Sequence, residues 1–213
     1  SIFKQFNDWS SQQFWLEDHA TFMELRRQNN NLPWWEWPRE FADYRKKELA
    51  EFQSKFKGNL LEHSLIQWHL FRQWSSVRTA AKRLGISIFG DLPFYVARDS
   101  SDVWSNRSLF SILSNGNLYQ QSGVPPDYFS ATGQLWGNPV YRWGMHKKTN
   151  FRWWRKRILR QWEQVDILRL DHFRALKAFW AIPGDASTAK DGYWLPSPGV
   201  KLLNLLRKDY GRQ

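Results

Sequence analysis

The stretch VDILRLDHFRALKAFW, residues 165–180, combines a short apolar run with three polar residues that can carry chemistry. The run at its start is typical of a buried strand, and Arg169, Asp171 and His172 follow where that strand should end. Side chains alternate across a strand, so Arg169 and Asp171 are expected on the same face, where the guanidinium would keep the carboxylate ionised. Such a cluster is either a structural ion pair or part of an active site.

Residues 86–96, ISIFGDLPFYV, repeat this arrangement earlier in the chain. They are predicted to form a short strand with Asp91 at its carboxyl end, preceded by a helix that stops at Gly85. A second helix pattern over residues 151–163 leads into the strand that starts at Val165. Alternating helices and short strands predict an α/β fold with parallel strands, and in barrels of this kind the catalytic groups lie at the carboxyl ends of the strands.

The remaining patterns predict further helices and one long connection. Helices are expected over residues 12–28 and, after a Pro-rich break, from Arg39 to Lys57, where Gly58 stops the pattern. The clearest helix has apolar residues at steps of four and three, namely Leu70, Trp74, Val77, Ala81 and Leu84. Residues 99–150 are rich in Gly, Pro, Asn and Ser, and we expect them to form a long functional loop.

Composition sets the broad class of the protein. The 213 residues are enough for one large domain, and the absence of cysteine removes disulfides, thiolate metal sites and thiol nucleophiles. Charges interrupt every apolar run, and the first residues lack the apolar centre of a signal peptide. We therefore expect a soluble, cytoplasmic protein without a membrane partner.

Charge and aromatic content suggest different ligands. A net charge of +11 is typical of nucleic-acid-binding proteins, but the basic residues are spread along the chain, so a solvated basic face is the preferred interpretation and no nucleic-acid partner is expected. Fifteen Trp and fifteen Phe exceed what a core of this size needs. Exposed aromatic rings suit ligands with flat apolar faces, which include sugars and bases.

The strand-end cluster would suit glycoside chemistry. An ionised Asp171 can act as a nucleophile, and a retaining mechanism also requires a second, protonated carboxyl about 5 Å away. His172 could hydrogen-bond a sugar hydroxyl or only cap the strand end. No residue pattern predicts a metal site or a cofactor.

Three long motifs raise the specificity of this interpretation. GDLPFYVARDSSDVW (90–104), SGVPPDYFSATGQLWGNPVYRW (122–143) and LRLDHFRALKAFWAIPG (168–184) closely resemble, in this order, the 4-alpha-glucanotransferases known as amylomaltases or disproportionating enzymes. The likeness extends to FWLEDHATFMEL near the start and TAKDGYWLPSPG near the end, so it covers essentially the whole chain.

The resemblance implies a (β/α)8 TIM barrel related to the alpha-amylases. Residues 1–213 would form the middle part of that catalytic domain, with a helical insertion near 12–60 and a cleft-covering loop at 122–138. The implied activity is the transfer of an alpha-1,4-glucan segment to the 4-hydroxyl of an acceptor glucan or glucose by retaining double displacement. Neither a cofactor nor a metal is implied.

The resemblance also assigns roles to residues. Asp171 matches the nucleophile and Arg169 the arginine that orients it. The residues implied in substrate binding are Asp91 at the donor subsite, Asp127, Tyr128 and Phe129 in the covering loop, Trp136 near the acceptor side, and His172, to which no catalytic role is carried over.

The chain is not expected to hold every catalytic residue of the family. The family's acid/base glutamate follows a DYGR stretch such as 209–212, so it is expected after Gln213, and the 213 residues alone are expected to be inactive.

Two alternatives to the transferase remain: a retaining alpha-glucan hydrolase and a glucan-binding protein without turnover. A loop that excludes water would favour a sugar acceptor over hydrolysis. A plastid location is the alternative to the cytoplasm if the source is a plant or an alga.

Overall fold

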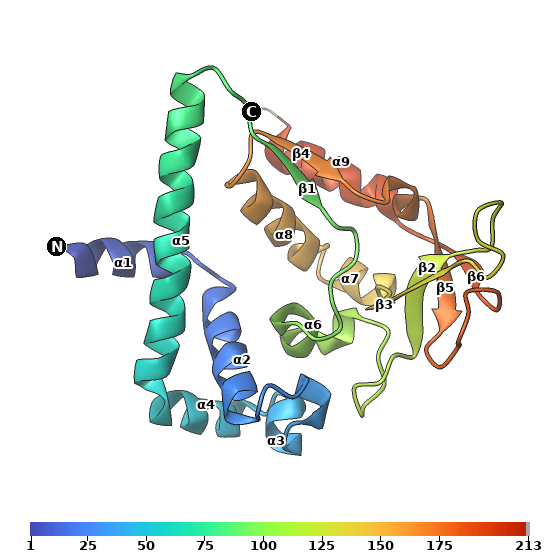
Figure 1. Cartoon of the computed structure of the whole chain (residues 1–213), viewed down its shortest axis with the longest axis horizontal. Helices are drawn as coiled ribbons and strands as arrows, with labels where there is room; N and C mark the ends of the chain where they lie inside the picture. Colours follow the sequence, from blue (N-terminus) through green and yellow to red (C-terminus); the bar gives the residue numbers. More distant parts are fainter. Residues whose placement is uncertain (212–213) are drawn as a thin grey trace. The chain divides into compact units, whose positions relative to one another are not determined.

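A computed structural model describes residues 1–211 of the chain. They form two compact units, one made of residues 1–86 and 99–105, the other of residues 87–98 and those from 106 onward (Figure 1). Arg212, the last residue of the DYGR stretch, lies outside the described residues. The assignment of residues 1–213 to one catalytic domain remains a prediction.

The first unit is helical. Its elements are α1 (Ile2–Ser10), α2 (Leu16–Gln28), the 3₁₀ helix η1 (Trp34–Glu36), α3 (Arg39–Ala42), α4 (Lys46–Lys55), α5 (Lys57–Arg83) and α6 (Ser101–Ser105). The helix expected from Arg39 to Lys57 is broken at Tyr44, whose φ of 55° lies in the left-handed region that ends helices. Gly58 does not stop a helix as expected, because α5 starts one residue before it.

Aromatic side chains fill the core of this unit. Trp104 packs against Phe22 and Trp37, with ring centroids 5.7 and 5.9 Å away, and its indole nitrogen donates to the carbonyl of Phe41 at 2.8 Å. Much of the tryptophan content is therefore structural. The buried tryptophans of the whole chain are Trp9, Trp34, Trp37, Trp68, Trp104, Trp143, Trp153 and Trp154.

The second unit contains two sheets. The small sheet pairs β1 (Phe89–Leu92) with β4 (Ile167–Leu170) in parallel, as expected, and α8 (Arg152–Trp162) is the helix predicted to lead into β4. The other sheet is antiparallel, in the order β3-β2-β5-β6. The remaining elements of this unit are β2 (Gln120–Val124), β3 (Gln134–Pro139), β5 (Ala178–Pro183), β6 (Tyr193–Pro196), η2 (Arg107–Leu109), η3 (Phe173–Leu176), α7 (Trp143–Lys148) and α9 (Gly199–Tyr210).

The antiparallel sheet corrects the expectation of a long loop over residues 99–150. Strands β2 and β3 form a hairpin within this range, so residues 122–138 are mostly the two arms and the tip of that hairpin. The register pairs Ser122 with Ala181, about sixty residues later in the chain. Local composition could not reveal this sheet, because β2 is stabilised by pairing with a distant segment.

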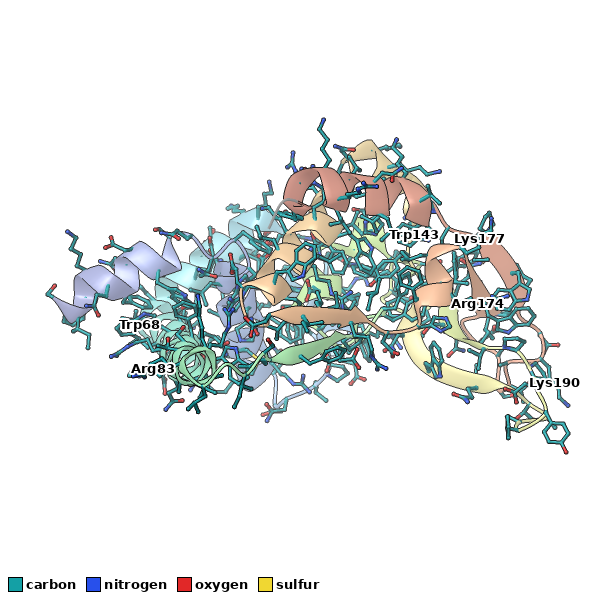
Figure 2. The ribbon with its side chains drawn as sticks, turned by 90° about the horizontal axis from the view of Figure 1, so that it is seen from above. Trp68, Arg83, Trp143, Arg174, Lys177 and Lys190 are labelled. Carbon is teal, nitrogen blue, oxygen red and sulfur yellow. The ribbon has the colours of Figure 1, made fainter. Side chains whose placement is uncertain are left out.

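Helix α8 holds the segment that follows β1. The guanidinium of Arg157 donates to the carbonyls of Pro93 at 2.6 Å and of Phe94 at 3.1 Å, and the hydroxyl of Tyr141 donates to the same Phe94 carbonyl at 2.6 Å. Trp143, labelled in Figure 2, packs its ring against Tyr141 at 5.2 Å. The chain beyond Asp91 is therefore anchored in the core of the unit.

Among the described residues, no helix combines the length and apolar character that crossing a bilayer requires.

Candidate active site

Parallel pairing of β1 and β4 brings Asp91 and Arg169 together. They are partners in the strand register, although 78 positions separate them in the sequence. The Arg169 guanidinium donates to Asp91 through Nε at 3.0 Å and through Nη2 at 2.5 Å, one bond to each carboxylate oxygen. This two-pronged geometry fixes both side chains at the surface of the sheet.

Asp171 lies just beyond the end of β4. Its backbone N–H donates to the carbonyl of Leu92 at 3.0 Å, which continues the pairing of the two strands past Leu170. Its carboxylate lies 3.6 Å from Nη2 of Arg169, with 56% of the side chain exposed. The ion pair that the sequence predicted between Arg169 and Asp171 is present, and the structure adds that the arginine's hydrogen bonds go to Asp91.

These contacts set the charge of the cluster. The two hydrogen bonds from Arg169 lower the pKa of the Asp91 carboxyl below its ordinary value, and Asp91 in turn raises the pKa of the guanidinium. Asp91 is therefore ionised at neutral pH and cannot serve as the protonated carboxyl of a retaining mechanism.

His172 follows with an unusual backbone. Its φ of 47° is left-handed, and its carbonyl accepts the amide of Ala175 at 2.9 Å at the start of η3. This turn places the imidazole among aromatic rings rather than at the strand cap. The ring centroid of Trp136 lies 4.9 Å away at an interplanar angle of 86°, and those of Tyr95 and Phe94 lie at 6.1 and 6.3 Å.

Burial lowers the pKa of His172. Its Nε2 atom is buried and has no hydrogen-bond partner among the described residues. An unsatisfied ring nitrogen is uncommon in native proteins and marks places where a ligand or water can bind. The charge of Asp171 raises the pKa of the imidazole, which indicates that the ring lies near that carboxylate.

The other expected substrate-binding residues divide into two groups. Trp136 contacts His172 and is part of the cluster. Tyr128 and Phe129 lie at the tip of the β2–β3 hairpin, 98% and 93% exposed, and their rings contact each other at 5.7 Å. Figure 1 shows this hairpin projecting away from β1 and β4. The described structure thus does not bring Tyr128 and Phe129 to Asp171.

Asp127 has a structural role in that hairpin. Its carboxylate accepts the backbone amides of Phe129 at 2.9 Å and Ser130 at 2.8 Å, which is the pattern of an Asx turn. The residue therefore shapes the tip that carries the two exposed rings. A direct contact with glucan remains a prediction.

Sequence reasoning missed Phe94 and Tyr95. Both are buried, and both contact His172. The signal was present, because Phe94 and Tyr95 stand two and three positions after Leu92, where β1 ends. Their role depends on packing against Tyr141 and α8, which no local pattern reveals.

A groove of about 1100 Å³ is lined by residues of η3, β6 and α9. The groove is mostly apolar. No carboxylate lines it, but four basic residues do, namely Arg174, Lys177, Lys201 and Lys208. The Arg174 guanidinium lies 3.6 Å from the ring centroid of Trp194; Arg174 and Lys177 are labelled in Figure 2. Without a carboxylate the groove cannot carry the chemistry that Asp171 offers.

Among residues 1–211, no three or more His, Cys, Asp or Glu side chains are grouped to hold a metal ion.

Parallel pairing of β1 and β4 gathers Asp91, Arg169 and Asp171 at or just past the carboxyl ends of the strands, which is where α/β barrel proteins carry their active sites. The chain belongs to the 4-alpha-glucanotransferase family, whose model matches residues 2–213. It is 43% identical over 202 residues to a 4-alpha-glucanotransferase of Synechocystis sp., which covers 94% of this chain. It is also 43% identical over 199 residues, or 93% of the chain, to a 4-alpha-glucanotransferase of rice named as chloroplastic/amyloplastic.

The structural comparison agrees. An amylomaltase from Streptococcus agalactiae, solved in complex with acarbose, matches 98% of this chain with a TM-score of 0.93 and 35% identity. The chain covers 42% of that protein, 40% of the Synechocystis relative and 33% of the rice relative. The predicted family and the α/β fold class are confirmed. The described residues form part of the barrel and do not close it.

Proposed function

We propose that the protein carrying this chain is a 4-alpha-glucanotransferase with Asp171 as its nucleophile. One observation carries the proposal: a backbone hydrogen bond to Leu92 fixes Asp171 just past the end of β4, with its carboxylate exposed beside the Arg169–Asp91 pair. A carboxylate in this position can attack the anomeric carbon of a bound glucan and form a covalent glycosyl intermediate. A second glucan then takes the segment on its 4-hydroxyl.

The neighbouring residues take different roles in this proposal. Arg169 orients Asp171 and neutralises part of the negative charge. Asp91, kept ionised by Arg169, accepts hydrogen bonds from hydroxyls of the donor sugar. As the family resemblance implies, the acid/base carboxyl would come from the part of the family's length that this chain does not span. Asp209, the last acid after Asp171, is paired with Arg155 at 2.5 Å.

Exposed aromatic rings support a glucan as substrate. Tyr128 and Phe129 present flat apolar faces at the hairpin tip, which suits stacking against sugar rings. The acarbose complex of the Streptococcus agalactiae relative supports the same ligand class. A retaining alpha-glucan hydrolase is the second candidate, because the half-exposed carboxylate of Asp171 is open to water.

We place the protein in the cytoplasm. The absence of cysteine and the bacterial relatives that carry the same name support this location. The chloroplastic/amyloplastic rice relative supports a plastid instead if the source is a plant or an alga.

A chimaera tests the proposed function. This chain would replace the matching 40% of the Synechocystis relative, and the products formed from maltotriose would be measured. We expect longer maltooligosaccharides, and a loss of several orders of magnitude in turnover for Asp171→Asn, which keeps the shape but removes the nucleophile. The matched control is Asp185→Asn in the β5–β6 connection, which should keep turnover. Glucose release without longer products would support the hydrolase, and near-normal activity of Asp171→Asn would exclude the proposed role.

A further inference from the structure

Three aromatic rings from two separate segments enclose the imidazole of His172. Phe94 and Tyr95 follow β1, and Trp136 lies on β3. Phe94 and Tyr95 are 2% and 6% exposed, and Arg157 and Tyr141 fix the backbone beside them. Two walls of the enclosure are therefore rigid parts of the core.

Trp136 is the third wall and the least buried one. Its ring stands nearly perpendicular to the imidazole at 4.9 Å and contacts Tyr95 at 6.0 Å. Its indole nitrogen donates to Gln134 at 3.1 Å, which restrains the ring from its own strand. The closest of the three rings to His172 thus comes from a strand that pairs neither with β1 nor with β4.

We propose that Trp136 is a positioning residue: with Phe94 and Tyr95 it completes an aromatic cage that fixes His172 beside Asp171. The resemblance placed Trp136 near an acceptor sugar, whereas its observed ring contacts are with His172 and Tyr95. The inference rests on the proposed function only in taking Asp171 as the nucleophile.

The backbone of His172 needs such support. A φ of 47° is a sparsely populated conformation for a residue with a side chain, and it persists only where the surroundings hold it. The ring of His172 contacts three aromatic neighbours, and the carbonyl of His172 accepts the amide of Ala175. Removal of the Trp136 side chain should therefore free the imidazole of His172 before it affects the backbone of that residue.

The cage also controls the charge next to Asp171. Burial is the main cause that lowers the pKa of His172; Asp171 raises it and Arg174 lowers it. Tyr95 is the other titratable group against the ring, and burial raises its pKa, so it stays neutral. Protonation of a caged imidazole would also leave two N–H donors in an enclosure where Nε2 has no acceptor among the described residues.

A neutral His172 has a consequence for the nucleophile. An imidazolium beside Asp171 would add a second cation to that of Arg169 and would stabilise the carboxylate against attack on the sugar. The neutral ring keeps one donor and one acceptor for a sugar hydroxyl without this cost. The cage thus extends the pH range over which Asp171 has a single cationic neighbour.

The test is an NMR titration of the histidine rings in the full 213-residue chain, with the His172 signal assigned from its loss in His172→Gln. We expect His172 to titrate below 6.5 in the unmodified chain, to move up towards 6.5 in Trp136→Ala, and to return in Trp136→Phe. Trp162→Ala on α8 is the matched control and should leave His172 unchanged. His146, buried in the same unit, reports whether the fold is intact in each variant.

Two results would overturn the inference. One is a His172 pKa that does not respond to Trp136→Ala. The other is a shift of His146 together with His172, which would mean that Trp136 supports the whole unit rather than one ring. In the chimaera, Trp136→Ala should move the acid limb of the kcat/KM profile to higher pH. Failure of the proposed function would show as an inactive chimaera with the NMR response of His172 intact.

Discussion

Arg169 connects the two carboxylates of the site, but it treats them differently. It gives both of its hydrogen bonds to Asp91 and approaches Asp171 only as an ion pair at 3.6 Å. Asp171 therefore keeps its oxygens available, while Asp91 is held in place. The arrangement explains how one arginine can neutralise charge near the proposed nucleophile without covering it.

Removal of this arginine should change the titration of Asp91. In Arg169→Gln we expect the pKa of Asp91 to rise towards the ordinary range of an aspartate, because the main cause of its lowering is the hydrogen bonding from Arg169. The measurement is a carboxyl carbon NMR titration. Arg174→Gln removes a cation that lies over the ring of Trp194 instead; it is the control and should leave Asp91 unchanged. An unaltered Asp91 titration in Arg169→Gln would disprove the assignment.

His146 makes stability depend on pH. Burial lowers its pKa to about 4, from an ordinary 6.5, so the unfolded chain takes up a proton in a range where the folded chain does not. The free energy of unfolding should therefore fall as the pH falls from 6.5 towards 4, by about 3 kcal/mol in total. Urea unfolding at several pH values measures this. His146→Gln should flatten the dependence.

At the scale of elements, the sequence predicted what local patterns determine. The strands at Asp91 and Val165 and the helix over 151–163 have their own apolar periods, and the structure has β1, β4 and α8 there. Asp91, Arg169 and Asp171 lie close together because they stand at or near the ends of β1 and β4, which pair with each other.

Elements that depend on distant partners were not predicted. β2 and β3 lie in a segment rich in turn residues, and they form strands because β2 pairs with β5 about sixty residues away. The apolar pattern of α5 was read correctly as a helix, but Leu70, Val77 and Leu84 are 53%, 51% and 74% exposed. Periodicity indicates a helix and does not show which of its faces is covered.

Gly199 allows α9 to approach the turn that follows His172. A Cβ atom at this position would lie 2.1 Å from the carbonyl oxygen of Leu176 in η3. Gly199→Ala should therefore push α9 away and lower the free energy of unfolding by about 1–3 kcal/mol. Gly144→Ala in α7, where nothing lies within 4 Å of the new atom, is the matched control. Denaturant unfolding compares the two, and equal stability would contradict the close approach.

At the scale of the whole molecule, the small parallel sheet has an uncovered face. Phe89 and Ile167 are register partners on that face, 62% and 50% exposed, and among the described residues β1 and β4 pair only with each other. Unpaired strand edges beside exposed apolar side chains favour association between chains. We expect the 213-residue chain to self-associate, as measured by light scattering after size exclusion.

Charge on this face should reduce the association. Ile167→Lys places a cation on the strand and should shift the chain towards the monomer. Phe129→Ser is the matched control, because Phe129 is 93% exposed at the hairpin tip and lies away from the sheet. A larger effect of Phe129→Ser would identify the hairpin, and not the sheet, as the associating surface.

Catalysis by the 213 residues alone should fail for a chemical reason. Retaining transfer needs a carboxyl that protonates the leaving oxygen and later deprotonates the incoming hydroxyl, a contribution of about 10²–10⁴-fold in rate. Arg169 lowers the pKa of Asp91, so Asp91 is ionised at neutral pH and cannot take this role, and the carboxylate of Asp209 is engaged by Arg155. We therefore expect no longer maltooligosaccharides from maltotriose with the purified chain, and transfer with the chimaera under the same conditions. Products longer than maltotriose from the chain alone would mean that a carboxyl among these 213 residues carries out the proton transfer.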